Sequence, residues 1–202
     1  WALCQVLTVL QLAEPDEERF YGRMRAETAA PAQEAFNDDD WFTRIAHPTL
    51  NPLLTGVFAL IEPAVVRARA QPIEQLGLSE QQRIDPSQHD APLAQTLFYA
   101  AGVLGVTLPA VYVNPQDQGG LAYLFTPSPS LSMGRVGMSH QVPPQVAAFV
   151  AARQLAYARP GLYLRHFIQT GTALKAWLFA AIKLSSPQFP IAADIEGSVT
   201  EA

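Results

Sequence analysis

The residues whose types and spacing come closest to a catalytic pattern are Arg153, Gln154 and Tyr157, within PPQVAAFVAARQLAYARP at 143–160. The pattern predicts a helix, on which residues four apart project from one face. Two histidines at this spacing, with a glutamate after the first, would bind zinc and activate water. Arginine cannot bind a metal, and glutamine cannot take a proton from water. We therefore expect no catalytic residue and no bound metal here.

The lack of acidic residues around this segment also argues against catalysis and metal binding here. No aspartate or glutamate occurs between Gln118 and Ala193, so the sequence offers no nearby carboxylate as a base or a third metal ligand. A buried Arg153 would pair with a carboxylate from elsewhere, such as Glu62 or Asp194, or with a backbone carbonyl. Alternatively, Arg153 faces solvent. The sequence leaves both interpretations open.

Other side chains of reactive types lack a spacing that indicates chemistry. Ser132 and Ser139 fall in or near predicted strands, but neither lies in a G-x-S-x-G nucleophile elbow. The single cysteine, Cys4, excludes an internal disulfide and fits a reducing compartment, so we expect a cytoplasmic protein without a cofactor. The histidines share no metal-ligand spacing; they are His47, His89, His140 and His166.

Three consecutive aspartates, Asp38 to Asp40, follow a polar, alanine-rich segment. One interpretation is a solvated connector or a helix terminus, where acidic side chains are favourable. The other is a calcium site, although the alternating ligand spacing of a calcium-binding loop is missing. The helix-terminus interpretation needs fewer assumptions.

Composition limits the size and the class of the protein. The chain has 202 residues, 49% of them hydrophobic, which is enough for one substantial core or for a main domain with a small appendage. Residues 1–62 hold ten acids and four bases, whereas residues 63–202 hold eight acids and nine bases. The bases are too scattered for nucleic-acid binding. The apolar start is too short to span a membrane, and we expect this chain to be a segment of a longer protein.

Apolar periodicity, prolines and glycines predict a mostly helical chain. Pro63 should kink or break the helix at 52–70. The expected buried face of this helix comprises Leu53, Leu54, Val57, Phe58, Leu60, Ile61 and Val65. Residues 71–91 should form a loop and those beyond 187 a loosely ordered tail. We expect helices at 1–12, from about 16 to 25, between 41 and 51, and at 52–70, 92–104 and 143–160. The last helix should begin at about Tyr163 or Thr172 and end at Leu184.

Three short segments predict a small antiparallel sheet: 106–113, 121–126 and 130–136, with Gly119 and Gly120 in a turn. The expected fold class is α+β and mostly α, in which helical layers accompany a sheet packed beside the RQLAY helix. We expect two domains, a helical pair at 1–30 and a helical plus small-sheet domain at 31–202.

The order of these elements resembles the catalytic core of small gluzincin metallopeptidases of the HtpX type. Val111–Val113 matches the first strand, Leu121–Phe125 the edge strand, Leu131–Val136 the third strand and Ala148–Tyr157 the active-site helix. The resemblance covers about residues 104–184, with HExxH replaced by RQLAY. The helical pair at 1–30 resembles the end of a tetratricopeptide array.

The resemblance implies a degenerate peptidase domain that serves protein interaction or scaffolding within a larger helical-repeat protein. In the family, the edge strand holds a peptide substrate by β-augmentation, and Leu121, Tyr123 and Phe125 would keep that capacity. The expected partner is a protein or peptide. The alternative is a hydrolase whose catalytic groups do not involve zinc and come from separate loops.

Overall fold

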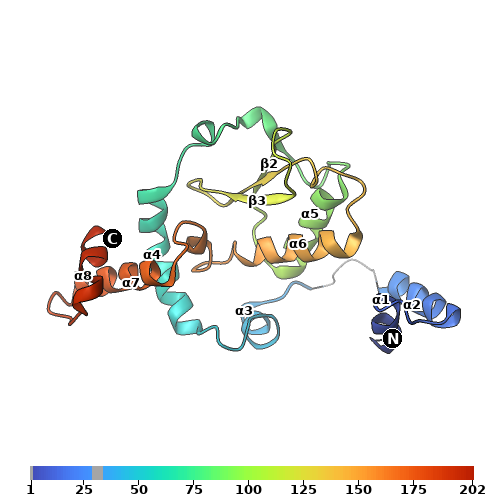
Figure 1. Ribbon diagram of the computed structural model, residues 1–202, viewed down its shortest axis with the longest axis horizontal. Coiled ribbons are helices and arrows are strands. Elements are labelled where there is room, and N and C mark those ends of the chain that lie inside the picture. The colour runs from blue at the N-terminus through green and yellow to red at the C-terminus, as the bar shows by residue number, and fades with distance from the viewer. Residues whose placement is uncertain (1, 29–33) are drawn as a thin grey trace. The chain divides into compact units, whose positions relative to one another are not determined.

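The computed structural model describes residues 2–28 and 34–202 (Figure 1). The chain forms two compact units, Trp1–Glu34 and Ala35–Ala202. The domain boundary predicted between residues 30 and 31 lies outside the described residues. We describe each unit by itself.

The first unit consists of two helices, α1 (Ala2–Val9) and α2 (Pro15–Thr28). Pro15 opens α2, where a missing backbone N–H has no cost. Three acids, Asp16, Glu17 and Glu18, occupy the first turn and complement the helix dipole. The helical pair predicted for this part of the chain is therefore present, although α1 ends at Val9 and not at Leu12.

The second unit contains the remaining helices and one small sheet. The fold class, α+β and mostly α, is confirmed. Its helices are α3 (Asp38–Asp40), α4 (Pro52–Arg69), α5 (Pro92–Leu104), α6 (Pro144–Ala156), α7 (Gly171–Ser185) and α8 (Ala193–Glu201). Its shorter turns are a π-helical turn η1 (Trp41–Ile45) and the 3₁₀ turns η2 (Ile73–Leu76), η3 (Glu80–Gln82) and η4 (Tyr163–His166).

The sheet is mixed, which corrects the predicted purely antiparallel sheet. Its strands are β1 (Arg83–Ile84), β2 (Ala110–Val113), β3 (Leu121–Leu124) and β4 (Ser130–Met133), in the order β1-β2-β4-β3. Strand β4 pairs antiparallel with β3 but parallel with β2. All four residues of β4 are buried, so β4 takes the interior position and β3 is left at the edge. Strand β1 lies within the segment that was predicted to be a loop.

Local signals fix the ends of helix α4. The Asn51 side chain accepts hydrogen bonds from the backbone N–H groups of Leu53 and Leu54, and Pro52 follows at the first helical position. The helix continues through Pro63, so the predicted break does not occur. Ile61 and Val65 are buried as predicted.

The predicted buried face of α4 is wrong at four positions. Leu53 and Leu60 are 82% and 83% exposed, and Leu54 and Val57 are also exposed, at 43% and 38%. Apolar periodicity shows which residues share a helix face, but it does not show that another element covers that face.

The two larger of three hydrophobic clusters in the described part of the second unit lie in different places. One lies between the sheet and helices α5 and α6, and it includes Leu97, Val111, Leu131, Met133 and Leu155. The other joins α4, η4 and α7 through Ile61, Val65, Tyr163, Ile168 and Trp177. In Figure 1, α6 runs beside the sheet, while α4, α7 and α8 form a separate helical group.

Helix α8 corrects the expectation of a loosely ordered tail beyond residue 187. Ile195 and Val199 are buried on one face of this helix, and α8 packs against α7. Across the described residues, no helix combines the length and the apolar character that crossing a membrane requires.

Candidate functional site

Arg153 and Tyr157 have different surroundings at the end of α6. Helix α6 ends at Ala156, so Tyr157 follows it as the C-terminal cap. The Tyr157 ring is half-buried and packs edge-on against Tyr123 and His166. Arg153 is exposed, and it forms no ion pair with any of the described residues. Of the two interpretations that the sequence left open, the structure therefore shows the solvent-facing one.

Gln154 joins helix α6 to strand β3. Its side-chain Nε2 donates a hydrogen bond to the Leu121 carbonyl oxygen at 3.2 Å. Its backbone carbonyl accepts a hydrogen bond from the Tyr123 hydroxyl. The residue that occupies the general-base position of the resembled motif thus connects helix and sheet.

The acids proposed as partners of Arg153 are placed elsewhere. The Glu62 carboxylate accepts hydrogen bonds from the backbone N–H groups of Gly161, at 3.0 Å, and Leu164, at 3.3 Å. Burial raises the pKa of Glu62, while these backbone hydrogen bonds oppose the rise. Asp194 is exposed in the first turn of α8. Glu62 therefore anchors the backbone that follows α6, and it does not pair with Arg153.

Gly161 allows this close approach between the chain after α6 and helix α4. Its φ is +79°, and a Cβ at this position would overlap with the Thr55 carbonyl oxygen. Only glycine meets both conditions without strain.

An aromatic cluster of Tyr123, Tyr157, Tyr163 and His166 lies between β3 and the end of α6. The His166 ring stacks on Tyr123 at a centroid distance of 3.6 Å. The Tyr163 hydroxyl donates a hydrogen bond to the Thr126 carbonyl at 3.1 Å. The side chains of the cluster thus hold β3, α6 and η4 together.

The ionisation of this cluster follows from its burial. Desolvation lowers the pKa of His166 to about 4, with a smaller contribution from Arg165. It also raises the pKa of Tyr163 to about 12 and raises that of Tyr123. The His166 Nε2 atom is buried and has no hydrogen-bond partner among the described residues. His166 is therefore neutral at pH 7, and the cluster carries no charge.

The predicted peptide-binding residues Leu121, Tyr123 and Phe125 do lie along the sheet edge. Gly134 donates to the Gly120 carbonyl, so the alternating pairing directs the backbone groups of these three residues away from β4. However, the Leu121 carbonyl accepts from Gln154, and the Phe125 carbonyl accepts from the Gln71 backbone N–H at 2.7 Å. Two of the three outward carbonyls therefore already have partners within the chain.

Arg159 has the buried pairing that was considered for Arg153. Its guanidinium contacts Asp38 at 2.6 Å, donates to the Leu104 carbonyl at 3.2 Å and lies 4.5 Å from the centroid of the Trp41 ring. Arg159 is only 7% exposed. The sequence signal for this ion pair was the excess of bases in 118–193 together with the aspartates at 38–40. It could not specify which arginine pairs with which acid.

The other candidates also have structural surroundings. Asp38–Asp40 form a helical turn capped by Asn37, which accounts for these acids as a helix terminus. Ser132 is buried, and its hydroxyl has no partner among the described residues. His140 and His89 both approach Asp90, at 3.9 and 3.6 Å. Within residues 2–28 and 34–202, no group of three or more His, Cys, Asp or Glu side chains could hold a metal ion.

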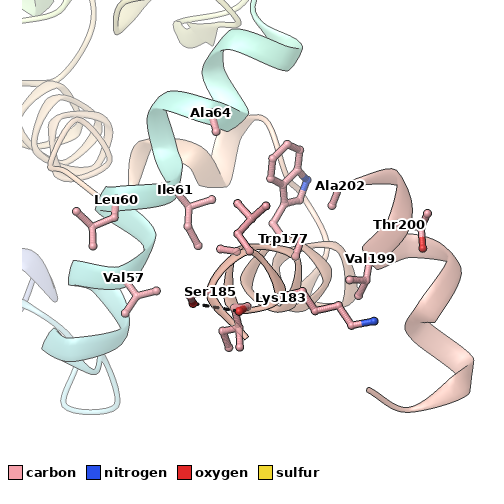
Figure 2. Close-up of a pocket in the computed structure, with 14 residues that line it drawn as sticks. Val57, Leu60, Ile61, Ala64, Trp177, Lys183, Ser185, Val199, Thr200 and Ala202 are labelled. Atoms are coloured by element: carbon pink, nitrogen blue, oxygen red, sulfur yellow. Dashed lines mark hydrogen bonds between the residues drawn. The ribbon is translucent and has the colours of Figure 1, made fainter. Parts of the chain in front are cut away.

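An apolar groove of about 680 Å³ lies between α4, α7 and α8 (Figure 2). Helix α4 lines one side of it, and the ring of Trp177 reaches into it from α7. The buried side chains of Ile61, Trp177 and Val199 contribute to its lining. This groove was not predicted from the sequence, because α8 was not predicted. The whole lining comprises Val57, Leu60, Ile61, Ala64, Trp177, Ala180, Ala181, Ile182, Lys183, Leu184, Ser185, Val199, Thr200 and Ala202.

Comparisons of this chain with known protein families, with curated proteins and with solved structures gave no match. The resemblance to HtpX-type gluzincins and to a tetratricopeptide pair therefore remains a prediction from the order of the elements.

Proposed function

We propose that this chain is a non-catalytic protein-interaction domain that binds its partner in the groove between α4, α7 and α8. The predicted role in scaffolding within a larger helical-repeat protein belongs to the same proposal. The single cysteine supports a reducing compartment such as the cytoplasm, and the scattered bases argue against a nucleic acid as the partner.

The surroundings of RQLAY support the non-catalytic part of the proposal. Gln154 uses its side chain and its backbone carbonyl to hold β3, and Arg153 faces solvent. A general base or a metal ligand must instead offer a free lone pair to a bound water or substrate. Gln154 therefore serves the fold, and Arg153 is left in solvent.

The groove is the observation that carries the interaction part. Leu60 is 83% exposed and Leu184 is 89% exposed at this groove, although both are large apolar side chains. Large apolar side chains gathered at one exposed site typically mark a surface that another molecule covers. The edge of β3 is a weaker candidate, because two of its outward carbonyls already accept hydrogen bonds within the chain.

The test is a quantitative pull-down with the full chain from a lysate of its source organism. Leu60→Glu places a charge in the groove, whereas Leu53→Glu places the same charge on α4 at an equally exposed position that does not line the groove. We expect an identified protein to be retained by the parent and by Leu53→Glu but lost by Leu60→Glu. Binding that is the same for all three chains would contradict the proposal.

Catalysis is tested separately with the same preparations. A panel of peptide and ester substrates, with added zinc and with a chelator, should give no turnover above the buffer blank. Turnover that is lost in Gln154→Ala would contradict the non-catalytic assignment and favour the predicted alternative, a hydrolase.

A further inference from the structure

The shape of the groove indicates what kind of partner segment it can take. Helix α4 contributes Val57, Leu60 and Ala64, which lie at positions i, i+3 and i+7 of one helix face. Seven residues of helix extend over about 10 Å, which is enough to contact two turns of another helix. Helices α7 and α8 supply further apolar lining. A trough between packed helices is the arrangement that receives an amphipathic helix through its apolar face.

The charge at the groove selects among such helices. Among the described residues that line the groove, Lys183 alone has a charged side chain. Figure 2 shows the Lys183 side chain on α7, extending toward the side of α8 and away from α4. Lys183 forms no ion pair with the described residues. Its ammonium group therefore offers an unused positive charge beside an apolar surface, where a carboxylate of the bound segment is favourable.

We propose that the groove binds an amphipathic helix whose apolar face is flanked by an aspartate or glutamate that contacts Lys183. This inference rests on the proposed function and specifies the chemistry of the partner. The helix supplies large apolar side chains to cover Leu60, Trp177 and Leu184, and its acid determines the direction in which it lies along the groove.

The test uses two fluorescent amphipathic peptides with the same apolar face. One carries glutamates beside that face, and the other carries lysines at the same positions. Fluorescence anisotropy with the full chain gives a Kd for each peptide. We expect the glutamate peptide to bind about two- to fivefold more tightly, as is typical of one exposed ion pair. Lys183→Glu should reverse this preference, whereas Lys175→Glu, on the same helix but outside the groove lining, should leave it unchanged.

The variants Leu60→Glu and Leu53→Glu test whether the peptides bind in the groove. The first should weaken both peptides at least tenfold, and the second should leave both Kd values unchanged. Equal affinity for the two peptides, with binding still lost in Leu60→Glu, would overturn the charge inference but not the proposed function.

Two further results would overturn the helix inference in different ways. Binding of a long-chain fatty acid but of neither peptide, with loss in Leu60→Glu, would assign the groove to a lipid. Self-association of the full chain in sedimentation, abolished by Leu60→Glu, would make a second copy the occupant. If the groove binds a fatty acid, a protein partner whose pull-down depends on Leu60 would still support the proposed function. The absence of such a partner would overturn both the proposed function and the helix inference.

Discussion

Two regions of the second unit use their side chains in opposite ways. Between α6 and β3, the polar side-chain groups of Gln154, Tyr123 and Tyr163 form hydrogen bonds within the chain. Between α4, α7 and α8, Leu60, Leu184 and Lys183 remain exposed or unpaired among the described residues. Gln154, at a spacing like that of a catalytic motif, thus serves the fold, whereas an exposed apolar groove forms from residues that share no motif.

The largest expected effect comes from Arg159, in the internally paired region. Arg159→Ala should lower the free energy of unfolding by about 2 kcal/mol, which corresponds to a fall in Tm of about 4–8 °C. Most of this loss comes from the buried Leu104 carbonyl and from the packing on Trp41, because the Asp38 side chain is 91% exposed and its ion pair is screened by solvent.

Arg153→Ala is the matched control for Arg159→Ala, because the two arginines are six positions apart and only Arg159 is buried. The control should change the free energy of unfolding by less than about 0.5 kcal/mol in urea denaturation. Equal losses in the two variants would mean that Arg153 also has a structural role.

A smaller effect is expected at the connection between α6 and β3. Tyr123→Phe removes the hydroxyl that donates to the Gln154 carbonyl and keeps the ring, so we expect a loss of about 1 kcal/mol. Tyr157→Phe should cost less than about 0.5 kcal/mol, because the ring contacts of Tyr157 with Tyr123 and His166 are retained. Thermal unfolding of both variants at pH 7 measures the difference.

The pH dependence of stability tests the burial of His166. Its pKa is about 4 in the folded chain and near 6.5 when it is unfolded. Between these values the unfolded state binds the proton more tightly, so stability that is present above pH 6.5 is lost as the pH falls toward 4. His166 is partly exposed, and we therefore expect a contribution of only roughly 0.5–1 kcal/mol.

His166→Phe should remove this contribution, so its stability should fall less than that of the parent between pH 7 and pH 4.5. If the parent and His166→Phe showed the same slope in urea titrations, His166 would not be buried as the structure places it.

The smallest effect on stability is expected in the groove. Leu60→Glu should change the free energy of unfolding by less than about 0.5 kcal/mol, because Leu60 is 83% exposed in the free chain. A loss of more than about 2 kcal/mol would mean that Leu60 packs within the fold, and the contrast between the two regions would disappear.

Local signals predicted much of this fold. Pro52, Pro92 and Pro144 begin helices, and Gly105 ends α5 with a φ of +61°. Each signal depends on backbone geometry within a few residues, which the sequence displays directly. The three longer strands were predicted for the same reason, because each is a short segment with apolar residues that is bounded by turn residues.

The candidate site could not be predicted in the same way. Asp38 and Arg159 are 121 positions apart, and no periodicity links them. The strand order depends on the burial of β4, which is decided by the elements that cover both faces of the sheet. The groove depends on how α8 packs against α7. These are properties of tertiary packing, and a residue pattern within one segment does not predict them.

The proposed partner contacts the groove and not the sheet edge. The most direct measurement is site-specific photo-crosslinking in living cells, with a photoreactive amino acid in place of Leu60 or of Ala122, the exposed residue of β3. We predict a crosslinked protein partner from position 60 and none from position 122. Crosslinking from position 122 and none from position 60 would contradict the account and assign binding to the edge strand.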